Sequence, residues 1–169
     1  MDVTTGPEDV AAGRILTAPP RGSRVGVLAP SSSGADLDRA GLPRAEERLA
    51  GIGLGVRYGS HLWDRGVLPA LPAEQRLEDF VRHLEDPEVS VIMAVYGGYN
   101  CIDLLPLLPY DAILDARKVI VGFSDITALL LGIYAATGLP GLHGPNLATL
   151  CEPTLRPAVL ESLRDALTP

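Results

Sequence analysis

Residues 118–138 read KVIVGFSDITALLLGIYAATG and place one hydroxyl and one carboxylate between two apolar runs. The first run, Val119–Val121, is typical of a buried strand. The second, Asp125–Thr137, is predicted to be a helix, and Gly138 follows in the C-cap position, where a left-handed residue commonly ends a helix. A buried turn between a strand and a helix needs neither polar group, so the Ser-Asp pair raises the question of an active site.

Other apolar segments extend this pattern along the chain. Val89–Gly98, VSVIMAVYGG, is apolar on both faces, as a central parallel strand is. Arg24–Pro30, RVGVLAP, is typical of a second short buried strand. The other expected elements are a strand from Gly53, a loop over 59–71, helices over Pro72–Leu84, Cys101–Leu108 and Arg156–Leu167, and a helix over Leu37–Leu49 that Pro43 disturbs.

Alternation of strands and helices predicts an α/β fold, a parallel-sheet sandwich of the Rossmann or flavodoxin type with about four strands and helices on both faces. Val25–Ala29, Val91–Val95 and Val119–Val121 should be adjacent inner strands. The Pro- and Gly-rich residues 1–22 are expected to be a loose lead-in. Residues 23–169 should then form one α/β domain.

Composition narrows the class of protein. The chain has 169 residues, of which 47% are hydrophobic, as in a globular domain. A net charge of −7 argues against nucleic acid or an anionic membrane as a partner. The apolar runs are too short to cross a bilayer, and the acidic N-terminus is unlike a signal peptide. A cytoplasmic enzyme or binding protein is the natural expectation.

Cofactor motifs are missing from the sequence. Cys101 and Cys151 form no disulfide framework and lack metal-ligand spacing. Neither GxxxxGK[ST] nor a GxGxxG after the first strand occurs, so the pattern does not resemble a nucleotide site. We expect neither a metal nor a cofactor.

Polar residues follow three predicted strands, at the edge where parallel sheets bind ligands. A serine on a tight strand-to-helix turn, Ser124, suits a nucleophile, since the next helix offers free N–H groups to an oxyanion. Taken alone, the turn is better explained by Ser124 capping the helix, with Asp125 in its favoured acidic first turn. Gly97 and Gly98 shift this balance, because a Gly-Gly loop lets the backbone approach a ligand and offers donors.

Other polar side chains have simpler interpretations. His143 is a candidate base, although a lone histidine beside Gly-Pro is more often a structural hydrogen-bonder. The thiol of Cys101 is best interpreted as buried and inert. The cluster Ser31–Ser33 is most simply a helix cap, and His61 and His83 have still less support as catalytic groups.

Four blocks of sequence carry a family resemblance: VGVLAPSS, EQRLEDFVRHLEDPEVSVIMAVYGGYN, LLPLLPYDAI and KVIVGFSDITALLLGIYAATGLPGLHGP. In this order and spacing, from about Arg24 to Pro145, they resemble the N-terminal domain of the LD-carboxypeptidase family of serine peptidases. That family includes murein tetrapeptide carboxypeptidases and microcin C self-immunity peptidases.

The resemblance implies a Ser-His-Glu peptidase that acts on a C-terminal residue. Ser124 lies at the nucleophile position, and the backbone N–H groups of Asp125 and of Gly97-Gly98 match the oxyanion hole. Asp125 is expected to contribute mainly backbone and turn. Tyr99 and Asn100 are implied to bind substrate, and this pair leans toward the microcin-immunity branch.

The resemblance also implies a second, C-terminal domain that carries the catalytic glutamate and histidine. We expect this chain to hold half of an active site, as a truncated protein rather than one whose other half is a separate chain or one with another role. The substrate would be a small peptide or a peptidyl nucleotide, and a homodimer is possible. The alternative is a non-catalytic binding module that retains the pocket without the base.

Overall fold

One parallel sheet of five strands forms the centre of the computed structural model, which describes residues 18–167. The strand order is β2-β1-β3-β4-β5, the flavodoxin-like order, and every pairing is parallel. The predicted lead-in over 1–22 lies outside the described residues as far as residue 17. The strands are β1 (Arg24–Leu28), β2 (Gly55–Tyr58), β3 (Val89–Ala94), β4 (Val119–Gly122) and β5 (Leu142–His143).

The three inner strands β1, β3 and β4 are buried on both faces, as their uninterrupted apolar sequences predict. Side chains alternate along each strand, so Val91 and Met93 join one hydrophobic cluster while Ile92 and Ala94 join the other. Val91 pairs with Val25 on one side and with Val119 on the other. The predicted adjacency of these three strands is therefore confirmed.

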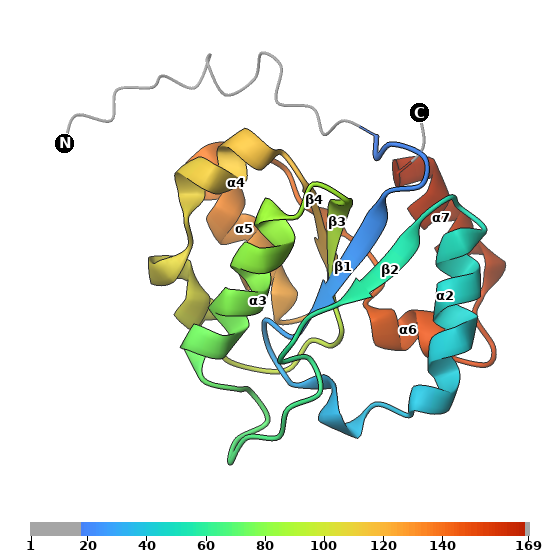
Figure 1. Ribbon diagram of the computed structural model, residues 1–169, viewed down its shortest axis with the longest axis horizontal. Coiled ribbons are helices and arrows are strands. Elements are labelled where there is room, and N and C mark those ends of the chain that lie inside the picture. Colours follow the sequence, from blue (N-terminus) through green and yellow to red (C-terminus); the bar gives the residue numbers. More distant parts are fainter. Residues whose placement is uncertain (1–17, 168–169) are drawn as a thin grey trace.

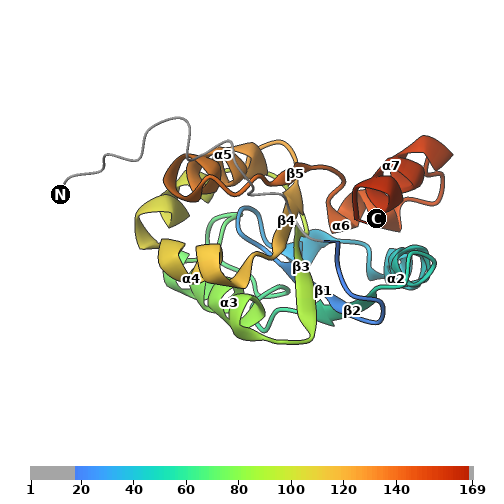
Figure 2. The ribbon, with the colours of Figure 1, turned by 90° about the horizontal axis from the view of Figure 1, so that it is seen from above.

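Helices cover both faces of the sheet (Figure 1, Figure 2). One group packs Leu49, Leu147 and Leu163 against the first cluster. The other packs Phe80, Ile113 and Leu129 against the second. The first group is α2 (Leu42–Ala50), α6 (Leu147–Cys151) and α7 (Pro157–Leu167), and the second is α3 (Ala73–Glu85), α4 (Tyr110–Ala116) and α5 (Ile126–Thr137).

The sheet has five strands instead of the expected four. The additional strand, β5, is only two residues long and exists because Leu142 and His143 pair with Val121 and Gly122 of β4. No periodicity in so short a segment distinguishes a strand from a loop. The short helices α4 and α6 were missed for the same reason.

The helix expected over Leu37–Leu49 begins later than predicted. One short 3₁₀ turn, Gly34–Asp36, precedes this segment, a second, Arg39–Gly41, lies in its first part, and α2 starts at Leu42. Pro43 thus lies in the first turn of α2, where its missing N–H costs no intrahelical bond. The segment predicted as Cys101–Leu108 is a 3₁₀ helix over Cys101–Leu107.

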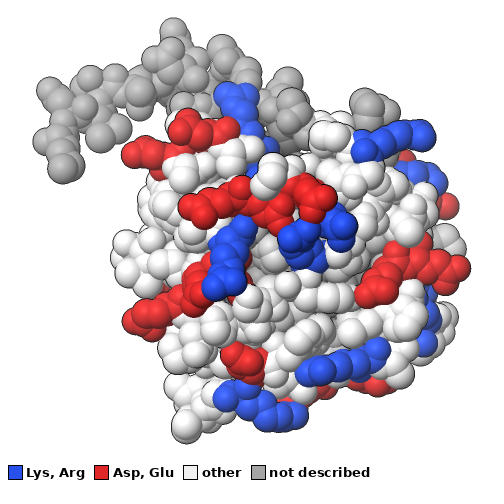
Figure 3. Space-filling model, viewed as in Figure 1, with Lys and Arg blue, Asp and Glu red and all other residues white. Residues whose placement is uncertain are grey.

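Charges of both signs are interspersed on the face shown in Figure 3. Ion pairs join some of the charged side chains in the described residues, as where Arg57 contacts Asp86 at 3.1 Å and also Glu88. Within residues 18–167, no helix combines the length and apolar character that a membrane span requires.

Candidate active site

Ser124 lies between the end of β4 and the start of α5, at the edge of the sheet formed by the carboxyl ends of the strands. Its φ is +63°, in the left-handed region that residues other than glycine seldom adopt. Such backbone strain costs about 1–3 kcal/mol and tends to occur at functional sites. The side chain is exposed, so the strained turn presents a hydroxyl to solvent.

The loop after β3 packs directly against this serine. A Cβ atom at Gly97 would lie 2.8 Å from Ser124 Cβ and 3.0 Å from Ser124 Oγ. Gly98 has φ +130°, and a Cβ there would overlap Ser32 Oγ. Both positions therefore require glycine, and the predicted closeness of the Gly-Gly loop to Ser124 is observed.

Ser124, Gly97 and Gly98 line one open depression of about 380 Å³, together with Ser32, Tyr96, Phe123, Asn146, Ala148 and Thr149. In the part of the chain that the structure describes, the backbone N–H groups of Gly97, Gly98 and Asp125 have no hydrogen-bond acceptor. The N–H of Asp125 is one of the free donors expected at a helix N-terminus. An exposed hydroxyl and unused donors thus meet at one edge.

Asp125 does more than the expected backbone and turn role. Its carboxylate Oδ2 accepts hydrogen bonds from the Ser31 hydroxyl at 2.5 Å and from the Cys101 N–H at 3.0 Å. The side chain therefore links α5 to the loop after β1 and to the loop after β3. No local pattern predicts these contacts, since Ser31 is 94 residues away in sequence.

The serines after β1 have separate roles. Ser33 caps the first 3₁₀ turn, accepting a hydrogen bond from the Ala35 N–H at 3.1 Å, so the capping prediction holds for this residue. Ser31 is fully buried and contacts Asp125 and the Tyr99 carbonyl, 3.0 Å away. The Ser32 N–H donates to the Gly97 carbonyl at 3.2 Å.

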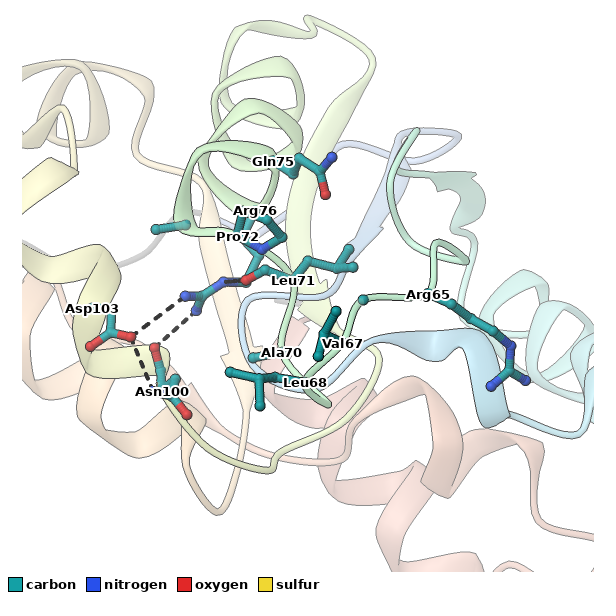
Figure 4. A pocket seen from close by; sticks show the side chains of 12 residues that line it. Arg65, Val67, Leu68, Ala70, Leu71, Pro72, Gln75, Arg76, Asn100 and Asp103 are labelled. Carbon is teal, nitrogen blue, oxygen red and sulfur yellow. Dashed lines mark hydrogen bonds and ion pairs between the residues drawn. The ribbon is translucent and has the colours of Figure 1, made fainter.

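The two residues expected to bind substrate lie at the far end of the same loop. Tyr99 is 74% exposed. Asn100 has φ +71° and lines a different cavity, of about 550 Å³, beside Arg76 and Asp103 (Figure 4). Asn100 thus follows Gly97 and Gly98 closely in sequence, but it does not line the depression around Ser124.

The histidines are not among the residues that line the Ser124 depression. His143 contacts Phe123 edge-on, with ring centroids 6.5 Å apart, and lines a neighbouring cavity that shares Phe123 with the depression. His83 is buried, lies 3.2 Å from the Val27 carbonyl through Nε2, and has a pKa lowered by burial. His61 lies between Asp64 and Glu78, whose hydrogen bonds raise its pKa.

Cys101 is a buried thiol rather than a reactive one. It is fully inaccessible, and burial raises its pKa to about 12. A thiol with such a pKa has almost no thiolate near neutral pH, and the thiolate is the nucleophilic form. This agrees with the interpretation of Cys101 as inert.

The fold and this edge of the sheet define a class: an α/β protein with an exposed serine on a strained strand-to-helix turn, an arrangement typical of acyl-transfer hydrolases. The LD-carboxypeptidase N-terminal domain family matches residues 25–144, and the chain belongs to this family. A putative carboxypeptidase from Treponema pallidum is 37% identical over 125 residues, which are 74% of this chain and 37% of the relative. The murein tetrapeptide carboxypeptidase of Pseudomonas aeruginosa is 35% identical over 128 residues, 75% of this chain and 40% of the relative.

Solved structures give the same assignment. The MccF-like protein of Bacillus anthracis superposes with a TM-score of 0.85 at 30% identity, covering 90% of this chain and 46% of that one. The microcin C7 self-immunity protein MccF, in complex with aspartyl sulfamoyl adenosine, gives 0.83 at 34% identity, with coverages of 92% and 47%. The chain therefore spans less than half the length of these relatives.

Proposed function

We propose that this chain is the nucleophile-bearing domain of a serine carboxypeptidase that cleaves an amide bond near a C-terminus. The observation that carries the proposal is Ser124, exposed on a strained turn with its hydroxyl against Gly97. The names of the relatives supply the substrate classes, an LD-peptide of murein or a microcin C-like peptidyl nucleotide. The enzyme interpretation is favoured over a binding module, because the turn presents a hydroxyl beside unused N–H donors, the groups that a nucleophile and an oxyanion hole require.

In this mechanism Ser124 Oγ attacks the carbonyl carbon of the scissile amide and gives its proton to a general base. The carbonyl oxygen becomes an oxyanion, which accepts hydrogen bonds from the N–H groups of the Gly97-Gly98 loop and of Asp125. The C–N bond then breaks, and the base returns the proton to the departing amine. Water hydrolyses the resulting acyl ester, which releases the acid and regenerates Ser124.

The base has to come from outside the depression, since none of its lining residues is a histidine, carboxylate or lysine. The relatives continue beyond the matched region. We propose that a histidine and a glutamate in the corresponding domain of this protein supply the general base. His143 is the alternative within this chain. Its ring packs on Phe123, however, and lines the neighbouring cavity.

The first test compares residues 1–169 with a longer protein that also carries the family's C-terminal domain. Release of the C-terminal residue from an LD-tetrapeptide, and of the aminoacyl nucleotide from a peptidyl nucleotide, is measured for both. The longer protein should turn over one of these substrates, and Ser124→Ala should lower kcat by about 10⁴–10⁶-fold. Residues 1–169 alone should show no turnover, because a base contributes about 10²–10⁴-fold and substrate is poorly held.

Thr154→Ala, which removes an exposed hydroxyl between α6 and α7, is the matched control and should leave kcat unchanged. Robust turnover by residues 1–169 would overturn the half-site proposal, and its loss in His143→Ala would identify His143 as the base. Full activity of Ser124→Ala would remove the nucleophile assignment altogether.

A further inference from the structure

Arg76 of α3 is a buried cation that the proposed chemistry does not use. Only 3% of the residue is exposed. Asp103 lies 3.8 Å from Nη2 and is itself half exposed, so the ion pair is loose. Burying a guanidinium is costly unless its N–H groups are hydrogen-bonded, and the identity of its partners therefore indicates what the residue does.

Its hydrogen bonds go to backbone carbonyls of three separate segments. Nε donates to Leu71 at 2.8 Å, and Nη1 donates to Pro30 at 2.8 Å and to Asn100 at 2.9 Å. These carbonyls belong to the end of the 59–71 loop, the loop after β1 and the loop after β3. Figure 4 shows the guanidinium reaching from α3 toward Asn100 and Asp103. Arg76 thus joins three loops that border the catalytic edge.

The contact with Asn100 is part of a two-sided grip on one peptide unit. The Asn100 carbonyl and the Cys101 N–H belong to the same peptide group, which is planar and rigid. Arg76 holds the oxygen of that group, and the carboxylate of Asp125 holds its N–H at 3.0 Å. At the other end of the loop, the Gly97 carbonyl is held by the Ser32 N–H at 3.2 Å. The Gly97–Asn100 loop is therefore fixed at both ends through its backbone.

We propose that Arg76 is a positioning residue for the oxyanion donors: by fixing the 100–101 peptide it holds the N–H groups of Gly97 and Gly98 in place against Ser124. This inference rests on the proposed function, which assigns those donors a role. Preorganised donors matter because removing one such donor costs about 10²–10³-fold in kcat in well-studied hydrolases. An arginine is suited to the task, since its planar fork serves three carbonyls at fixed angles, which a lysine ammonium does not.

The test is Arg76→Lys in the longer, active protein, with Arg82→Lys as the matched control. Arg82 lies on the same helix, but its side chain is 60% exposed and pairs with Glu78. Arg76→Lys should lower kcat by about 10–10²-fold with KM changed less than about threefold, because the loss falls on the transition state. Arg82→Lys should leave both constants unchanged. An unchanged kcat in Arg76→Lys, or a loss confined to KM, would overturn the proposal.

A second measurement separates this inference from the proposed function. Amide NMR spectra of residues 1–169 should show shifted resonances for Gly97, Gly98 and Cys101 in Arg76→Lys and unshifted ones in Arg82→Lys. If Ser124→Ala remains active, the proposed function fails, while this spectrum still reports whether Arg76 holds the loop. Resonances that do not move would overturn the positioning role whatever the activity shows.

Should Arg76→Lys fail to fold, Arg76→Ala assayed with added guanidinium provides the alternative. Millimolar guanidinium should restore part of kcat, and ammonium at equal ionic strength should not, because only the planar ion reproduces the fork. Equal effects of the two ions would contradict the proposal.

Discussion

Glycine is required at two positions near Ser124 because the backbone there lies close to serine side chains. The φ of Gly97 is not positive, so glycine is needed there for space. Gly98 is needed for both space and its φ of +130°. The sequence indicates such positions well, since adjacent glycines after an apolar strand predict a close approach. It does not indicate that the carboxylate of Asp125 binds Ser31 and Cys101, because these partners are brought together only by folding.

Gly97→Ala should damage the site more than the fold. The added Cβ would lie within 3.0 Å of Ser124 and force the loop and the turn apart, so kcat of the longer protein should fall by at least about 10²-fold. The free energy of unfolding should fall by about 1–3 kcal/mol, as for other overpacked sites. Steady-state kinetics and urea unfolding measure the two effects.

Gly51→Ala is the matched control, because φ is −61° there and an added Cβ meets nothing closer than 3.4 Å. Gly51→Ala should change neither kcat nor the free energy of unfolding by much. Wild-type kcat in Gly97→Ala would show that the loop tolerates displacement and is no oxyanion hole.

The cysteines should be unreactive in the folded protein. Burial raises the pKa of Cys101 to about 12 and that of Cys151 above its ordinary value. A disulfide reagent at pH 8 should therefore label neither thiol until urea unfolds the chain, and then label both. Rapid labelling of one thiol in native protein, assigned with Cys101→Ala and Cys151→Ala, would contradict the buried placement.

Helix α3 buries polar residues that its sequence pattern does not predict to be buried. Its helical apolar spacing predicts one buried face made of Leu77, Phe80, Val81 and Leu84. Of these residues, Phe80 and Leu84 are buried and the other two are partly buried. Arg76, Asp79 and His83 are also buried, and hydropathy assigns such residues to solvent. Their partners are backbone atoms on other segments, as where Asp79 accepts from the N–H groups of Ser60 and His61. Long-range contacts of this kind were not predictable from local pattern.

Burial of His83 should make stability fall on acidification. Its folded pKa lies below the ordinary value of about 6.5, so below that pH the unfolded state binds more protons. The free energy of unfolding should therefore drop as pH falls from about 6.5, and His83→Gln should reduce that drop. Urea unfolding at several pH values between about 7.5 and 5 measures it.

His61 has the opposite sign and serves as the control. The hydrogen bonds that the carboxylates of Asp64 and Glu78 accept from its ring raise the pKa of His61, so it adds stability that is present below about pH 6.5 and is lost as pH rises through the raised pKa. His61→Gln should make the loss on acidification steeper. A His83→Gln protein with the wild-type pH profile would show that the fold does not lower the pKa of His83.

At the scale of the whole molecule, one sheet separates two hydrophobic clusters. The inner strands contribute to both clusters, since each is apolar on both faces, and this is why the fold class was predictable from three short segments. The edge of the sheet that contains β5 and the depression around Ser124 was less predictable. Strand β5 is defined by its pairing with β4, and the depression around Ser124 takes Asn146 and Thr149 from beyond it.

Shared strands should make the two clusters unfold together. Ile133 lies in the cluster on the α5 side, whereas Trp63, the only tryptophan, packs against the other. Ile133→Ala should lower the free energy of unfolding by about 2–5 kcal/mol. Trp63 fluorescence and far-UV circular dichroism should shift together in urea. Separate transitions for the two probes, or a tryptophan transition that does not move, would show that the layers unfold independently.

The backbone grip on the Gly97–Asn100 loop has a consequence for how specificity can evolve. Because the anchors bind the carbonyls of Gly97 and Asn100 and the N–H of Cys101, the exposed side chain of Tyr99 is not needed to hold the loop. If the proposed function holds, a mutation at position 99 can change which substrates bind while Ser124 and the Gly97-Gly98 loop keep their places. The fold would then oppose few changes at position 99, which makes it a natural first choice for directed evolution.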